Sequence, residues 1–218
     1  MPENSTEERI RTMRAYGAKV ILTPSHAGME GTIDEARRRL ASGGRVMLDQ
    51  FGNDDNWRAH LEGTGPEILR DAPGITHFVS AMGTTGTIMG VSRALRESGR
   101  SVEIVGCQPT EGSRIPGIRR WPREYLPRIF DPTRVDRTID VSQGDAENGA
   151  RDLARRAGVF TGPSAAGAWH VACGIAESIT EGTIVTILCD RGDRYVSSDV
   201  FGPDHPNIGE LEVVRWQP

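Results

Sequence analysis

A glycine- and threonine-rich segment carries the residue types that could hold a small anion. The segment reads Gly83, Thr84, Thr85, Gly86 and Thr87. Glycines let a backbone turn tightly and approach a ligand, and amides at a helix N-terminus point outward. Together with three threonine hydroxyls, these groups suit a phosphate dianion. An ordinary tight turn between a strand and a helix is the alternative that the loop alone leaves open.

Nucleotide-binding versions of such a loop do not match this sequence. A P-loop ends in Gly-Lys-Ser or Gly-Lys-Thr, and residues 83–87 have no such ending. Their glycine spacing also differs from the dinucleotide-binding fingerprint. A nucleoside triphosphate or a dinucleotide is therefore not the expected ligand.

Two further positions lie where a ligand could meet them. Ser164 follows Gly162 and Pro163 directly before a predicted helix, where it could cap that helix or contact a ligand. Cys189 begins the string Cys-Asp-Arg-Gly-Asp-Arg-Tyr at the carboxyl end of a predicted strand. Ligands of open α/β sheets collect at that edge. For Cys189 by itself, an inert buried thiol is the alternative.

Alternating strand and helix signals would position these residues. Apolar runs predict strands at 19–22, 45–48, 76–82, 102–107 and 183–189. Helical patterns predict helices over about 4–17, 33–44, 87–97, 145–157 and 165–179. In the first of these helices, Ser5 and Glu8 have the spacing of a capping box. The alternation predicts an α/β fold with a parallel sheet flanked by helices.

Residues 111–137 interrupt the alternation with a long segment that contains four prolines and the string Arg119-Arg120-Trp121. Loops of this length inside a domain are functional or disordered, and the aromatic and proline content favours an ordered lid. The two arginines could also be solvated loop charges. A turn-rich string at 52–56 predicts a boundary between a smaller lobe, 1–54, and a larger lobe, 55–218.

Composition narrows the class of protein. The formal net charge of −4 gives no basic surface for nucleic acid. No apolar run approaches the roughly 20 residues that span a bilayer, and the first nine residues are unlike a signal peptide. Three cysteines far apart predict neither a disulfide framework nor a zinc cluster. We therefore expect a protein of the reducing cytoplasm, with no membrane or nucleic-acid partner.

In combination, the motifs resemble fold-type II pyridoxal-phosphate (PLP) enzymes, and most closely the B-type cysteine synthases (O-acetylserine sulfhydrylase B). The matching segments are 49–51, 64–68, 83–87, 115–122 and 189–195, and the resemblance runs from Met1 to about Phe201. It implies a tryptophan synthase β-like α/β fold that is incomplete at the N-terminus. Departures occur at Ala165-Ala166-Gly167 and at residues 53–57.

The resemblance also implies roles. Pyridoxal 5'-phosphate would be the cofactor, with its phosphate on residues 83–87 and its pyridine nitrogen hydrogen-bonded by Ser164. The substrate-binding residues implied are Gln50, Arg119, Arg120 and Cys189. The implied reaction is synthesis of L-cysteine from O-acetylserine and sulfide, thiosulfate or another sulfur donor, by a homodimer.

The largest departure from the family is the absence of the lysine that carries the cofactor. That lysine lies in a Ser-x-Lys-Asp-Arg segment, and a Thr-Ser-Gly-Asn-Thr loop binds the substrate carboxylate; neither string occurs here. Lys19 is the sole lysine and does not match that position. We expect that Met1 corresponds to an internal methionine of a longer enzyme, and that this chain alone folds poorly and turns over no substrate.

Two other interpretations remain. A truncated, non-catalytic paralogue could act as a phosphate-binding or partner-binding module. A related β-replacing enzyme, such as a cystathionine β-synthase, is disfavoured by the string Ile-Pro-Gly-Ile-Arg-Arg-Trp at 115–121.

Overall fold

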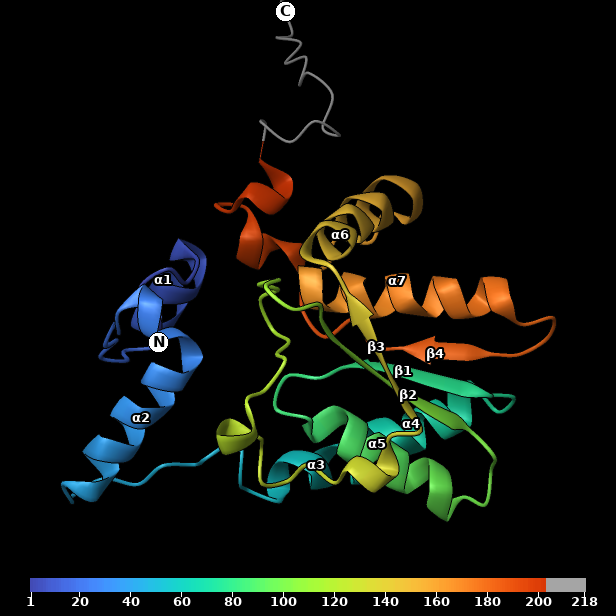
Figure 1. The fold of residues 1–218 in the computed structure, drawn as a ribbon, viewed down its shortest axis with the longest axis horizontal. Coiled ribbons are helices and arrows are strands. Elements are labelled where there is room, and N and C mark those ends of the chain that lie inside the picture. The colour runs from blue at the N-terminus through green and yellow to red at the C-terminus, as the bar shows by residue number, and fades with distance from the viewer. Residues whose placement is uncertain (203–218) are drawn as a thin grey trace, which may run out of the picture.

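A computed structural model describes residues 1–202, and a parallel sheet of four strands lies at its centre (Figure 1). The strands are β1 (His77–Ala81), β2 (Glu103–Pro109), β3 (Arg137–Val141) and β4 (Ile184–Thr186). Their order is β3-β2-β1-β4, and all three pairings are parallel. Parallel pairing places the carboxyl ends of the strands at one edge. The predicted parallel α/β sheet is confirmed.

Helices cover both faces of this sheet (Figure 1). On one face lie α3 (Asp55–Ala59), α4 (Gly65–Asp71) and α5 (Gly86–Glu97), with a π-helical turn at His60–Thr64. On the other lie α6 (Gln143–Ala157) and α7 (Pro163–Ser178). The remaining short helices are 3-10 turns at Ser25–Ala27, Arg123–Tyr125, Pro132–Arg134, Gly192–Tyr195 and Asp199–Phe201. None of the helices within residues 1–202 has the length and apolar character to cross a membrane.

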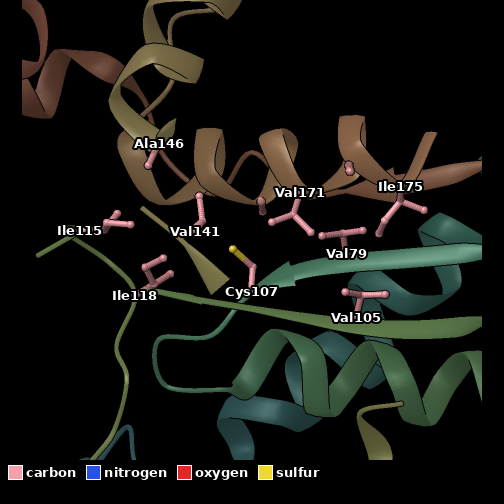
Figure 2. Packing of buried hydrophobic residues seen from close by; sticks show 11 residues of the cluster. Val79, Val105, Cys107, Ile115, Ile118, Val141, Ala146, Val171 and Ile175 are labelled. Atoms are coloured by element: carbon pink, nitrogen blue, oxygen red, sulfur yellow. The ribbon is translucent and has the colours of Figure 1, made fainter. Parts of the chain in front are cut away.

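The core between the sheet and α7 also anchors the predicted lid. Val79, Val105 and Val171 pack between the sheet and the helix, and Ile115 and Ile118 join the same cluster from the loop after β2 (Figure 2). Ile115 is 4% exposed and Ile118 is 1% exposed. Because two isoleucines of the loop are buried in the core, the turn between them is held in place.

The N-terminal region, residues 1–54, lies beside this core (Figure 1). It contains α1 (Glu7–Ala15) and α2 (Gly28–Ala41). The strands predicted at 19–22 and 45–48 are wrong, since this region contains no ladder and only one isolated bridge, between Pro2 and Thr23. An apolar segment forms a strand only where another strand pairs with it, and none does so here.

Several local predictions also need correction. Thr6, not Ser5, is the N-cap of α1; the Ser5 hydroxyl donates to the Pro2 carbonyl at 2.7 Å, so no capping box forms. Gly162 is the N-cap of α7 and Ser164 lies inside its first turn. Strand β3 and residues 55–71 of the helical face were not predicted, and β4 is shorter than the run at 183–189. Residues 203–218 of the predicted larger lobe lie outside the described residues.

Candidate cofactor-binding site

The loop between β1 and α5 has a strained backbone. Thr85 is the N-cap of α5, with φ of 70° and ψ of −1°. Left-handed geometry is unfavourable for a β-branched residue, and such strain is concentrated at functional sites. Thr85 precedes the first amides of α5, and free amides at a helix N-terminus can bind an anion.

Two glycines of the loop allow the backbone to approach other chain segments closely. A Cβ on Gly83 would collide with the carbonyl oxygen of Gly117, and one on Gly86 would collide with the side-chain amide of Asn56. Gly117 itself has φ of 98°, and a Cβ there would lie 2.6 Å from the Ser164 hydroxyl. Gly117 therefore lies between the phosphate-loop candidate and Ser164, and brings these two predicted sites together.

The threonine hydroxyls of the loop differ in their partners. Thr84 Oγ1 accepts from Asn56 Nδ2 at 3.1 Å, and Thr87 Oγ1 lies 3.2 Å from His60 Nε2. Thr85 Oγ1 is buried and has no hydrogen-bond partner. An unsatisfied buried hydroxyl costs about 1–3 kcal/mol. A ligand oxygen within hydrogen-bond distance of Thr85 Oγ1 would remove that cost.

His60 supports the loop from the π-helical turn. Its Nδ1 lies 3.0 Å from Thr64 Oγ1 while Nε2 meets Thr87. Burial lowers the pKa of His60, which favours the neutral ring. A neutral ring has one donor and one acceptor nitrogen, so it can link the two hydroxyls. π-Turns inside helices are frequent at functional sites.

Ser164 and Cys189 form the second part of the site. Ser164 is 1% exposed, and its hydroxyl lies 3.6 Å from the Cys189 sulfur. Burial of the sulfur raises the pKa of the Cys189 thiol although the residue as a whole is exposed, and the hydrogen bond with Ser164 opposes this rise without cancelling it. The thiol is therefore protonated at neutral pH. Ser164 keeps a hydroxyl whose protein partner is only a weakly hydrogen-bonding sulfur.

The lid is fixed to the loop by hydrogen bonds from its arginine–tryptophan string. The backbone amide of Arg119 donates to the Met82 carbonyl at 3.0 Å, and Trp121 Nε1 donates to the Gly83 carbonyl at 2.7 Å. The Trp121 ring meets Phe51 edge-on, with centroids 5.2 Å apart. These contacts hold Arg119 and Trp121 against the loop, and the role of residues 111–137 as a lid stays a prediction.

The four predicted substrate residues are not all at this site. Arg120 donates from Nε to the Pro109 carbonyl at 2.9 Å and pairs with Asp140, so its charge is already matched. Gln50 is exposed, and its carbonyl accepts from Asn56 at 2.6 Å. The roles predicted for Gln50, Arg119, Arg120 and Cys189 stay predictions.

Sequence reasoning assigned no role to Gly117, Asn56, Trp121 or His60. Gly117 and Trp121 lie in the Ile-Pro-Gly-Ile-Arg-Arg-Trp string, which was noted only as a whole. A proline followed by glycine between two isoleucines predicts a tight turn with buried flanks, and that signal could have identified Gly117. For Asn56 and His60 the contacts depend on how α3 packs on α5, which no local pattern shows.

These features lie together after the first strand of a parallel sheet, and residues 1–190 match the family described as pyridoxal-phosphate dependent enzymes. The chain belongs to this family. It is 54% identical over 204 residues to cysteine synthase B of Pseudomonas aeruginosa, covering 93% of this chain and 68% of that protein. Cysteine synthase B of Escherichia coli is 54% identical over 210 residues, covering 96% of this chain and 69% of that protein.

Solved structures agree with this assignment. O-ureido-L-serine synthase is 33% identical and superposes with a TM-score of 0.83, covering 92% of this chain and 67% of that chain. The fold-type II class predicted from the motifs is confirmed, and the chain is similar to cysteine synthases, which are enzymes that use PLP.

The residues present fit the phosphate and ring of PLP. The strained Thr85 with its unpartnered hydroxyl suits the phosphate, and buried Ser164 suits the pyridine nitrogen. The chain's sole lysine, Lys19, is exposed between α1 and α2. No lysine lies in residues 83–87, in residues 111–137 or in α7.

Proposed function

We propose that this site serves the PLP-dependent synthesis of L-cysteine from O-acetylserine and sulfide, thiosulfate or another sulfur donor. The observation that carries the proposal is the contact series from Gly83 through Gly117 to Ser164, beside the buried, unpartnered hydroxyl of Thr85. The proposal is supported by this series because the glycine- and threonine-rich loop and the neutral hydroxyl of Ser164 both lie next to Gly117. Similarity to two cysteine synthases B supports the choice of reaction.

In this proposal, different residues of the chain would bind the phosphate, the ring and the sulfur donor. Thr85 and the first amides of α5 would hold the phosphate, and Ser164 would orient the ring through its nitrogen. When bound, PLP supplies an electron sink for negative charge at the substrate α-carbon. A hydroxyl at the ring nitrogen does not hold that nitrogen protonated, so the sink is moderated, which suits loss of acetate followed by addition of a thiol. Arg119 on the lid would contact the sulfur donor, and the same role for Arg120 would require its pair with Asp140 to open.

We further propose that these 218 residues alone hold PLP without a covalent link and form no cysteine. Lys19, exposed in the N-terminal region, does not supply the amine that covalent catalysis needs. The division into lobes at 1–54 and 55–218, the homodimer and the cytoplasmic location belong to the same proposal. Free thiols at Cys107, Cys173 and Cys189 agree with a reducing compartment.

The purified chain should be titrated with PLP, and cofactor absorbance should be followed before and after dialysis. We expect saturable binding that dialysis reverses, and no cysteine from O-acetylserine and sulfide. Thr85→Val removes the unpartnered hydroxyl and should weaken binding about tenfold. Thr186→Val is the matched control and should bind normally, because it removes the other threonine hydroxyl within residues 1–202 that is buried and unpartnered, at the last residue of β4.

A phosphate-binding module without catalysis is a second candidate function, and the position of Lys19 favours it. Such a module would bind inorganic phosphate as well as PLP. Cofactor absorbance that survives dialysis, together with cysteine formation, would contradict the non-covalent part of the proposal. Equal PLP affinity of wild type and Thr85→Val would contradict the placement of the phosphate.

A further inference from the structure

Helix α1 is tied to the chain that follows Cys189 by polar contacts. Thr6 Oγ1 donates to the Arg194 carbonyl at 2.8 Å. The Glu8 carboxylate accepts from the backbone amide and the hydroxyl of Ser197, at 2.9 and 2.6 Å. These contacts join the N-terminal region to the 3-10 turn beside the candidate site, as the neighbouring positions of α1 and this turn in Figure 1 also show.

Among these residues of α1, Arg9 contacts a fully buried side chain, that of Tyr195. Its Nη2 donates to the Tyr195 hydroxyl at 2.5 Å, and its guanidinium carbon lies 4.9 Å from the Tyr195 ring centroid. Tyr195 is 0% exposed and donates in turn to Asp190 Oδ2 at 2.5 Å. Burial and the bond to Asp190 raise the pKa of Tyr195, so its hydroxyl remains a donor. Arg9 thereby brings a positive charge to 4.0 Å from the Asp190 carboxylate.

Asp190 is held on its other sides by the chain that leads to Ser164. Its carbonyl accepts from Thr161 Oγ1 at 2.8 Å, and its carboxylate fills the space that a Cβ on Gly162 would need. Asp190 also follows Cys189 directly, and the Cys189 sulfur lies 3.6 Å from the Ser164 hydroxyl. A shift of Asp190 would therefore disturb the Ser164–Cys189 pair from both sides.

We propose that Arg9 is a positioning residue for the ring end of the cofactor site, acting through Tyr195 and Asp190 to hold Cys189 against Ser164. The proposal rests on the proposed role of Ser164 at the pyridine nitrogen. Asp190 Oδ1 is buried without a hydrogen-bond partner, so its carboxylate depends on the Oδ2 contact and on the nearby guanidinium. Removal of Arg9 would leave the negative charge of this carboxylate without a nearby positive charge, and the Asp190 side chain would then move toward solvent.

The first test measures the Cys189 thiol directly. Wild type, Arg9→Ala, Arg9→Lys and Tyr195→Phe are treated briefly with a maleimide, and mass spectrometry quantifies labelling of each cysteine peptide. Arg9→Ala and Tyr195→Phe should raise the Cys189 labelling rate about three- to tenfold, as expected for loss of a charge-assisted hydrogen bond. Arg9→Lys keeps the charge and should restore part of the protection.

Two controls keep the result specific. Arg11→Ala removes another arginine of α1, whose partner Glu7 is on the same exposed face, and should leave Cys189 labelling unchanged. Cys107 is 0% exposed and reports opening of the whole fold. Equal Cys189 rates in Arg9→Ala and Arg11→Ala would overturn the proposal. A rise at Cys107 that matches the rise at Cys189 would also overturn it, because Arg9 would then stabilise the fold as a whole.

The second test separates the two ends of the site. Arg9→Ala should weaken PLP binding about three- to tenfold while inorganic phosphate binds as in wild type, because Arg9 contacts Tyr195 and Asp190 at the ring end of the proposed site. Equal weakening of both ligands would overturn the positioning role. If wild type binds phosphate but no PLP, the proposed function fails, and the labelling experiment still decides the role of Arg9.

Discussion

Helices α2 and α5 show how differently the two regions of this molecule are built. They have similar lengths, 14 and 12 residues, yet α5 buries eight residues and α2 buries none. Helix α5 packs on the sheet, whereas α2 lies beside the remainder of the chain (Figure 1). An apolar stripe becomes core only when a second layer covers it.

The same difference holds for the whole N-terminal region. Within residues 1–54 only Pro2 and Thr23 are buried, and Val46 and Leu48 are 92% and 83% exposed. A mostly apolar cavity of about 370 Å³ lies among α2, residues 47–51 and the lid at 125–128. The candidate phosphate and ring contacts, by contrast, all come from residues 55–202. The candidate contacts therefore come from the well-packed region, and the N-terminal region meets the surrounding segments through α1, including Arg9, and through Gln50 and Phe51.

The largest expected effect compares equivalent leucines in the two regions. Leu95→Ala removes a side chain that is 0% exposed on α5 and should lower the free energy of unfolding by about 3 kcal/mol. Leu40→Ala on α2, where the leucine is 37% exposed, should cost less than about 1 kcal/mol. Urea denaturation followed by circular dichroism measures both. Similar losses would show that α2 packs as tightly as α5.

A second measurement compares the two regions without substitution. Hydrogen exchange followed by mass spectrometry should show slow exchange in β1 and β2, by on the order of a thousandfold relative to an unstructured peptide. Peptides of α2 and of residues 42–50 should exchange quickly, since they have exposed backbone and few buried contacts. Equal protection in α2 and β1 would contradict the contrast between the regions.

The smallest expected effect is a pH dependence from His60. Burial lowers its pKa below the usual 6.5, so the folded chain favours the neutral ring. Above pH 6.5 both states are neutral and His60 contributes nothing. As pH falls below that value, the unfolded chain takes up the proton first, so stability is lost.

Urea midpoints measured between pH 7.5 and about 5 should therefore fall more steeply for wild type than for His60→Gln. His26 is exposed, and its replacement by glutamine is the matched control for the loss of one histidine. Parallel slopes for wild type and His60→Gln would show that the ring is not desolvated in the folded chain.

The fold was predicted from sequence where local pattern and packing agree. Strands β1 and β2 are apolar runs that lie inside a parallel sheet, so pattern and burial coincide. The same kind of run at 45–48 is not a strand, because nothing pairs with it. Strand β3 was missed since its Arg-Thr-Ile-Asp-Val sequence lies at a sheet edge and alternates with polar residues.

The candidate site was likewise predicted only where a local sequence pattern carries the signal. Residues 83–87 and Ser164 could be identified because glycine, threonine and serine before a helix carry a local signal. The contact of Gly117 with both, and the path from Arg9 through Tyr195 to Asp190, join segments distant in sequence. Such contacts depend on how the elements pack, and no spacing rule in one sequence predicts them.

The central claim is that the loop at 83–87 holds the phosphate of PLP, and phosphorus NMR of the bound cofactor tests it most directly. Gly83→Ala would force a Cβ into the backbone of Gly117, whereas Gly174→Ala places one in open space on α7. We predict a distinct bound phosphate resonance for wild type and Gly174→Ala, and only the free resonance for Gly83→Ala. A bound resonance of wild-type position and intensity in Gly83→Ala would contradict the claim.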